Sequence, residues 1–156
     1  MGVFVVKSLS VFLGLFFVFV GVLKLSPIVS RELHKDLRKE YVRYAKVFPL
    51  AQALNFKVPP KWYRRVVGGT EIMSGLILAF IPHGRLKQVA NVTLILFMLG
   101  AIYTHWILDD KFERVAPALV FFFMLTCRLI VDWQLKYRAS KAKVAREVPA
   151  KETKAE

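Results

Sequence analysis

The chain has 156 residues, of which 56% are hydrophobic, and its 24 basic and 11 acidic residues give a formal net charge of +13. This apolar content exceeds that of an ordinary soluble domain, and the basic residues lack the aromatic-interleaved motifs and zinc spacings of nucleic-acid-binding modules, so we expect anionic lipid headgroups rather than nucleic acid as partners. Cys127 is the only cysteine, which excludes an internal disulfide and a CxxC redox pair.

Four apolar runs are each close to the ~20 residues needed to cross the hydrocarbon core of a bilayer. They cover about residues 8–26, 65–82, 89–108 and 115–133. The first run is N-terminal and follows Lys7, but it is long for a secretory signal and no small-x-small cleavage site follows it, so we expect a retained helix. The sequence therefore predicts an all-α fold, a four-helix transmembrane bundle over residues 1–135.

The connection between the first two runs predicts an amphipathic helix over about residues 28–48. Its apolar positions recur at spacings of three or four, namely Val29, Leu33, Leu37, Tyr41, Tyr44 and Phe48. The opposite face is charged, so this helix should lie on the membrane surface or cap the bundle. A solvated surface helix is the alternative.

The remaining connections are short, which makes the second, third and fourth membrane helices antiparallel neighbours. Residues 136–156 lose the apolar content and alternate in charge, which is typical of a basic, disordered tail. The basic residues divide almost evenly between the two sides. The turn with Arg85 and Lys87 has no acid, whereas the DDKFER turn is net negative, and this favours cytosolic termini.

One acidic residue interrupts the second apolar run. Glu71 follows Arg65 by six residues and so lies roughly 9 Å along the helix from that end. An ionised carboxylate facing lipid there is costly, so Glu71 should face the bundle, be protonated or find a partner. Lys24 ends the first helix on the same side of the membrane, and the sequence predicts an ion pair between the two. Alternatively, Lys24 extends to the interface and Glu71 stays neutral.

Small residues share the face of the second helix that carries Glu71, and the first helix has a matching face. Such faces let neighbouring helices approach closely. The residues are Gly68, Gly75 and Ala79 on the second helix, and Gly14 and Gly21 on the first.

The third helix carries Asn91 and His105 on one face, with His105 on the same side of the membrane as Glu71. A single histidine near a helix end is more often an interfacial hydrogen-bonding group than a ligand. The pattern leaves open that His105 joins the Lys24–Glu71 network.

The last helix carries Arg128 in the half of the bundle opposite to Glu71, near Asn91. Asp132, one turn further on, could pair with Arg128. A cation that only fixes helix packing is the alternative. With Lys24, Glu71, His105 and Asn91, these residues form the predicted intramembrane polar network.

Patterns of catalysis and metal binding are missing from the sequence. No Cys/His/acid cluster has metal-ligand spacing, no histidine pair suits an axial haem site, and no GxSxG, HExxH or Walker pattern occurs. We therefore expect no catalytic residue, metal or cofactor, and a non-enzymatic protein that recognises other membrane helices. A small proton- or ion-coupled carrier using Glu71 and His105 is the alternative, although four short helices without an inverted repeat leave little room for alternating access.

Four stretches that together span roughly residues 10–132 carry a resemblance to known proteins. They are LGLFFVFVGVLKLSP (13–27), GTEIMSG (69–75), KQVAN (87–91) and PALVFFFMLTCRLI (117–130). Through them the chain resembles the DoxX-like family and, within it, the novel acetylcholine receptor chaperone family.

The resemblance implies a multi-pass, four-helix bundle of the endoplasmic reticulum membrane with cytosolic termini. It also implies an activity, which is to promote the folding and assembly of nicotinic acetylcholine receptor subunits, and it makes those subunits the partners. Some DoxX-like relatives are named as subunits of membrane oxidoreductases, which is a further alternative. The polar residues that match the family pattern by position are Lys24, Glu71, Asn91, His105 and Arg128.

Overall fold

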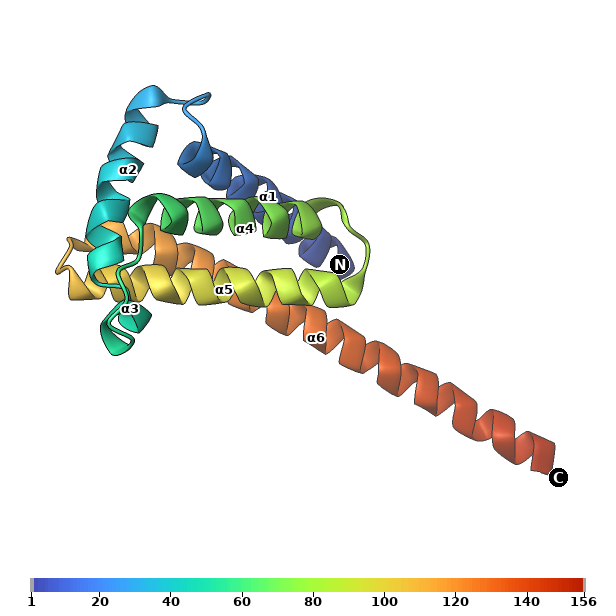
Figure 1. The fold of residues 1–156 in the computed structure, drawn as a ribbon. Coiled ribbons are helices and arrows are strands. Elements are labelled where there is room, and N and C mark those ends of the chain that lie inside the picture. Colours follow the sequence, from blue (N-terminus) through green and yellow to red (C-terminus); the bar gives the residue numbers. More distant parts are fainter. Residues whose placement is uncertain (1, 156) are drawn as a thin grey trace.

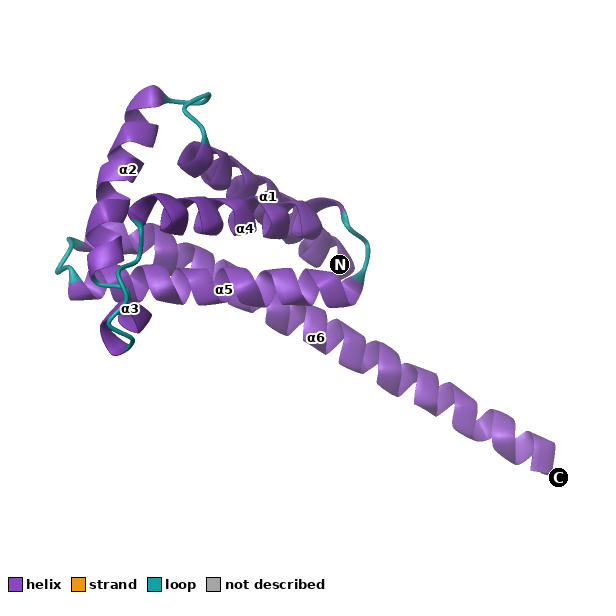
Figure 2. Cartoon of the chain, in the orientation of Figure 1, coloured by secondary structure: helices purple, strands orange, loops and turns teal. Residues whose placement is uncertain are grey.

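The computed structural model describes residues 2–155, with side chains over residues 2–149, and in this part of the chain all regular secondary structure is helical, without a strand. In chain order the helices are α1 (Gly2–Leu25), α2 (Arg31–Lys46), α3 (Pro49–Ala53), α4 (Pro60–Phe80), α5 (Gly84–Ile107) and α6 (Phe112–Ala155). Helices α1, α4, α5 and the first half of α6 form the bundle, and α2 crosses one end of it (Figure 1). Short loops join the helices (Figure 2). The all-α fold class is confirmed.

Local signals explain where the helices of the first connection begin. The Ser30 side chain accepts a hydrogen bond from the Leu33 N–H at 3.3 Å, which caps the N-terminus of α2. Pro49 and Pro60 occupy the first positions of α3 and α4, where the missing N–H costs nothing. Helix α2 is therefore shorter than the predicted 28–48, and the additional helix α3 follows it.

Helices α1 and α4 make the most extensive contact in the bundle. A methyl group on Gly14 would lie 2.5 Å from the Gly75 carbonyl oxygen, and one on Gly21 would lie 2.6 Å from the carbonyl oxygen of Gly68. The two backbones touch at both points because none of these four residues has a side chain. This is the close approach that the small-residue faces predict.

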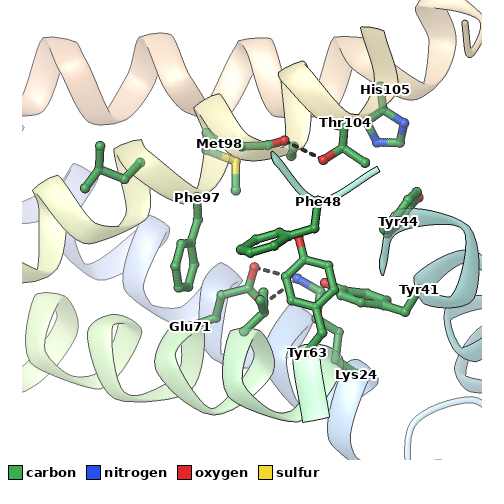
Figure 3. A pocket seen from close by; sticks show the side chains of 14 residues that line it. Lys24, Tyr41, Tyr44, Phe48, Tyr63, Glu71, Phe97, Met98, Thr104 and His105 are labelled. Atoms are coloured by element: carbon green, nitrogen blue, oxygen red, sulfur yellow. Dashed lines mark hydrogen bonds and ion pairs between the residues drawn. The ribbon is translucent and has the colours of Figure 1, made fainter. Parts of the chain in front are cut away.

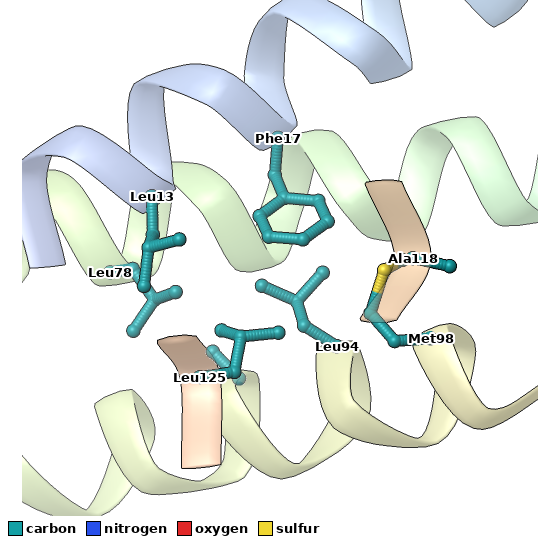
Figure 4. Close-up of a cluster of buried hydrophobic side chains, with 8 residues drawn as sticks. Leu13, Phe17, Leu78, Leu94, Met98, Ala118 and Leu125 are labelled. Atoms are coloured by element: carbon teal, nitrogen blue, oxygen red, sulfur yellow. The ribbon is translucent and has the colours of Figure 1, made fainter. Parts of the chain in front are cut away.

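The hydrophobic core fills the space among α1, α4, α5 and α6 (Figure 4). Leu13, Leu78, Leu94 and Leu125 have no exposed surface, and Phe17 is almost fully buried beside them. Each of the four helices thus contributes one fully buried leucine. The shared core holds α5 and α6 against the α1–α4 pair.

Three of the helices are long and apolar enough to cross a membrane. They are Gly2–Leu25, Gly84–Ile107 and the part of α6 from Phe112 to Pro149. Helix α4 differs because it carries Arg64, Arg65 and Glu71 within its 21 residues. Large hydrophobic side chains cover the outward faces of the three helices, as expected of surfaces that contact lipid.

The end of the chain differs from the sequence-based expectation. The tail 136–156 is predicted to be disordered, whereas α6 continues as helix through Ala155 and projects beyond the bundle (Figure 1). Every described side chain from residue 136 to residue 149 is exposed or nearly so. Alanine, lysine, arginine and glutamate dominate this segment, and their intrinsic helix propensity favours continuation of α6.

Candidate functional site

A buried ion pair joins α1 to α4. The Lys24 Nζ lies 2.5 Å from each carboxylate oxygen of Glu71, and the residues are 9% and 1% exposed. The predicted ion pair is therefore present in the structure. The contact is short and bidentate, so both oxygens of the carboxylate accept a hydrogen bond from Lys24. The charge of Glu71 therefore has a partner inside the bundle.

The glycines of the helix crossing make room for this pair. A methyl group on Gly68 would lie 3.1 Å from the Lys24 Cβ, so a larger residue at position 68 would displace the start of the lysine side chain. The Arg64 guanidinium donates a hydrogen bond to the Lys24 carbonyl oxygen. That bond satisfies one of the carbonyl groups left without a helical partner at the end of α1.

The ion pair lies in the wall of a cavity of about 240 Å³ between α2, α4 and α5 (Figure 3). The other lining residues include five phenylalanine and tyrosine side chains, namely Tyr41, Tyr44, Phe48, Tyr63 and Phe97. Four of these rings contact one another edge to face, with distances between ring centroids of 5.2–5.3 Å for Tyr41–Tyr44, Tyr41–Tyr63 and Phe48–Tyr63. Edge-to-face contacts are a favourable arrangement of aromatic pairs, so the wall is well packed.

The tyrosines of α2 are uncharged at neutral pH. Burial, and then the neighbouring charge of Glu71, raises the pKa of Tyr41 well above its usual value of 10.0. Burial is also the main cause that raises the pKa of Tyr44, to about 12. Each hydroxyl therefore keeps its proton and can both donate and accept a hydrogen bond.

His105 lines the same cavity, but its partner is Asp110 and not the Lys24–Glu71 pair that the sequence leaves open for it. Its Nδ1 lies 2.9 Å from Asp110 Oδ2, and Asp110 Oδ1 accepts a hydrogen bond from Arg43 at 3.0 Å. The hydrogen bond from His105, followed by the contacts with Arg43, holds the pKa of Asp110 below its usual range. This cluster ties α2 to the α5–α6 connection, and His105 does not join the Lys24–Glu71 pair.

Sequence reasoning missed Asp110 and Arg43 because both lie outside the apolar runs. Glu40 extends the same cluster, with oxygens 2.9 Å from Arg43 and 3.0 Å from Arg114. The only signal in the sequence is that the net charge of α2 is positive and that of the connection after α5 is negative. That signal does not choose among the many possible pairs.

A second polar cluster lies in the opposite half of the bundle. Arg128 is 1% exposed, and it donates hydrogen bonds to Ser10 Oγ at 2.7 Å and to Asn91 Oδ1 at 3.3 Å. The Asn91 amide donates in turn to the Leu125 carbonyl oxygen at 3.0 Å. The cluster links α1, α5 and α6, and Ser10 is the member that the sequence does not reveal.

Asp132 is not the partner of Arg128. Its carboxylate pairs with Lys136 at 2.8 Å and accepts a hydrogen bond from Gln88 at 3.4 Å. The reason is orientation, since Arg128 points into the bundle while Asp132 lies nearer to its end, within reach of a lysine one turn further on. Within residues 2–149, no three His, Cys, Asp or Glu side chains are grouped so that they could hold a metal ion.

Comparison with known proteins gives one family and several similar chains. The sequence model of the DoxX-like family matches residues 8–127. A protein of Xenopus tropicalis named "Novel acetylcholine receptor chaperone" is 36% identical over 141 residues, which is 90% of this chain and 85% of the relative. The protein of the same name from Mus musculus is 35% identical over 142 residues, which is 91% of this chain and 83% of the relative.

Proposed function

Because the chain belongs to the DoxX-like family and, within it, to the novel acetylcholine receptor chaperones, we propose that it is an endoplasmic reticulum membrane chaperone that promotes the folding and assembly of nicotinic acetylcholine receptor subunits. The observation that carries the proposal is the 36% identity over 90% of the chain with a protein of that name. In this proposal the protein is not an enzyme, and its partners are the membrane helices of unassembled receptor subunits.

The proposal includes a four-span bundle in which α4 is the fourth span. What supports it is that the basic residues of α4 lie in its first two turns and that its remaining charge, Glu71, is paired with Lys24. Helix α1 begins at the end of the bundle from which α6 projects (Figure 1), as an even number of spans requires. The acid-free turn at Arg85 and Lys87, at that end, favours the cytosolic side.

Client helices would contact the outward faces of α5 and α6. These faces carry exposed large apolar side chains, among them Leu96, Leu99, Phe123 and Ile130. An unassembled receptor subunit presents helix surfaces that its neighbours will later cover, and an apolar helix face can cover them in the interim. The buried Lys24–Glu71 pair and the buried cluster around Arg128 would keep the chaperone rigid during this contact.

The proposal is tested by surface toxin binding in cells that express a homopentamer-forming nicotinic subunit, with and without this protein. We expect a large increase with the protein, and loss of most of that increase with Glu71→Gln. The matched control is Lys141→Gln on the exposed tail, which should keep the increase. Equal effects of both substitutions, at equal protein level and location, would count against the proposal.

One observation favours a second candidate, a proton- or ion-coupled carrier. Glu71 and His105 line the same cavity, as a pair of titrating groups on one pathway would. The purified protein in liposomes would then show a proton or cation flux that Glu71→Gln abolishes. Absence of any flux above that of empty liposomes removes this candidate.

Anionic lipid headgroups are proposed as further partners. A hollow of about 750 Å³ between α2 and the start of α4 has no acidic side chain among its described lining residues. Its cations are Lys35, Arg38, Lys39, Lys61, Arg64 and Arg65. We expect more bound phosphatidylserine than phosphatidylcholine in native mass spectra. Arg38→Gln with Lys61→Gln should reduce that excess, whereas Arg138→Gln with Lys141→Gln should not.

A further inference from the structure

Three tyrosines line the cavity, Tyr41, Tyr44 and Tyr63, and none of their hydroxyls has a hydrogen-bond partner among the described residues. The rings of two of them, Tyr41, which is 6% exposed, and Tyr63, lie beside the Lys24–Glu71 pair (Figure 3). Every fully enclosed side-chain nitrogen or oxygen in the described part of the chain has a partner. These two hydroxyls must therefore reach open space, and the space next to them is the cavity. A hydroxyl at the wall of a cavity can donate a hydrogen bond to an occupant and accept one from it.

The charges around the cavity select an uncharged occupant. Both oxygens of Glu71 are held by Lys24, so neither member of the pair is free to neutralise a further charge. For a cation or an anion in the cavity, attraction by one member of the pair is offset by repulsion from the other, and the cost of leaving water remains. For a neutral hydroxyl that cost is smaller, and the group can both donate to and accept from the tyrosine hydroxyls.

The cavity opens sideways along α5. Leu96 and Gly100 line it, yet Leu96 is 60% exposed and Gly100 is exposed as well. A methyl group on Gly100 would meet no atom within 4 Å, so no other helix covers α5 at this point. Helix α5 is one of the helices apolar enough to span a membrane, which places the opening against hydrocarbon rather than water. An occupant would therefore enter from the bilayer.

We propose that the cavity binds the hydroxyl end of an uncharged lipid, whose hydrocarbon part leaves between Leu96 and Gly100. The volume of about 240 Å³ is below the range of roughly 300–1,000 Å³ that encloses a whole drug-sized ligand, so the cavity takes one end of a longer molecule. The site goes beyond the chaperone function and does not depend on it. Failure of the receptor experiment would leave it intact.

The test uses three photoreactive probes that share one hexadecyl chain with a diazirine and differ only in the head. The heads are an alcohol, a carboxylate and a trimethylammonium group. The full-length protein is reconstituted in phosphatidylcholine nanodiscs, irradiated with each probe and digested for mass spectrometry. We expect the alcohol to label α4 and α5 residues around the cavity, with labelling that saturates. The two charged probes should label only diffusely.

Paired substitutions separate ligand binding from folding. Tyr41→Phe with Tyr63→Phe removes the two hydroxyls without taking a hydrogen bond from the described chain, so the fold should keep its thermal stability. Labelling by the alcohol should fall about tenfold, the effect of two modest hydrogen bonds. The control is Tyr103→Phe with Tyr137→Phe, which removes two hydroxyls at positions 43% and 61% exposed and outside the cavity lining. This control should label as the wild type does.

Three results would overturn the proposal. One is equal or stronger labelling by the trimethylammonium probe, which would make the aromatic wall a site for cations. Another is unchanged alcohol labelling in the Tyr41/Tyr63 variant. If that variant fails to fold, Ala101→Phe replaces it, because a phenyl ring there fills the cavity and leaves both tyrosines in place. The third result that would overturn the proposal is alcohol labelling of Ala101→Phe at the wild-type level.

Discussion

Gly14 on α1 and Gly75 on α4 face each other so closely that a methyl group on either one would lie 2.5 Å from the carbonyl oxygen of the other. Contact between the backbones of two helices maximises dispersion attraction where no hydrophobic effect drives association. Because the obstacle is backbone on both sides, no side chain can move aside to admit a larger residue.

The first prediction concerns this crossing. Gly75→Ala should lower the free energy of unfolding in detergent by about 1–3 kcal/mol, the usual cost of overpacking. Gly69→Ala is the control on the same helix, since a methyl group there meets nothing within 4 Å, and it should be neutral or slightly stabilising. Thermal unfolding of the two variants side by side measures the difference. Equal melting temperatures would refute a tight crossing.

The second prediction concerns the buried ion pair. Glu71→Gln leaves the Lys24 charge buried without its partner, and a loss of about 3–5 kcal/mol in unfolding free energy is expected. The double variant Lys24→Met with Glu71→Gln removes both charges and should recover most of that loss. A double-mutant cycle by chemical unfolding checks this. Additive losses in the double variant would contradict the pairing.

The third prediction concerns Arg128. Lysine keeps the charge but has one nitrogen on a flexible chain, so Arg128→Lys cannot serve Ser10 and Asn91 from two separate nitrogens as arginine does. We expect a loss of about 1–3 kcal/mol from the hydrogen-bonding group left unpaired. Arg138→Lys, at an exposed position on the same helix, should change nothing measurable. A cost at Arg138 as large as that at Arg128 would show that the effect is not specific to the cluster.

The fourth prediction concerns pH. The pKa of Asp110 is lowered in the folded chain, chiefly by its hydrogen bond with His105, so its ionised form stabilises the fold above its unfolded pKa of about 3.9. That stabilisation is lost as the pH falls from there through the folded pKa. The protection of residues 108–111 against hydrogen exchange, taken relative to the intrinsic exchange rate at each pH, should therefore fall below about pH 4.

The control for the pH effect is a pair of substitutions at neighbouring positions. Asp110→Asn should remove the dependence and exchange rapidly at every pH. Asp109→Asn should behave as the wild type, because Asp109 forms no ion pair in the described chain and its φ of 52° suits asparagine. An acid-induced loosening that persists in Asp110→Asn would assign the effect to another group.

The sequence predicts the helices and the Lys24–Glu71 pair for the same reason. Apolar runs near 20 residues have few alternatives to a helix, and a buried glutamate needs a partner at the same depth, where Lys24 is the residue available. Gly14 and Gly75 are visible in the same way, because a face of small residues has few uses other than close helix packing.

The cavity is not predictable in this way, and neither is the cluster of Arg43, His105 and Asp110 that ties α2 to the α5–α6 connection. Tyr41 reads as part of the apolar face of an amphipathic helix, and nothing in its spacing shows that α2 leaves a space above Glu71. Ser10 is missed because serine in an apolar helix can bond its own backbone, and here it bonds both Val6 and Arg128. Such features depend on how helices cross, and periodicity within one helix does not fix crossing.

The two polar clusters at opposite ends of the bundle together determine its axial register. Smooth apolar helices can slip past one another by a turn, about 5.4 Å, at little cost in lipid. Here any slip of α1 would break the bond to Glu71 at one end and the bond from Arg128 at the other. The bundle therefore has a fixed hydrophobic length. It meets a thinner bilayer by tilting as a block, and a thicker one by thinning the bilayer around it, rather than by sliding its helices.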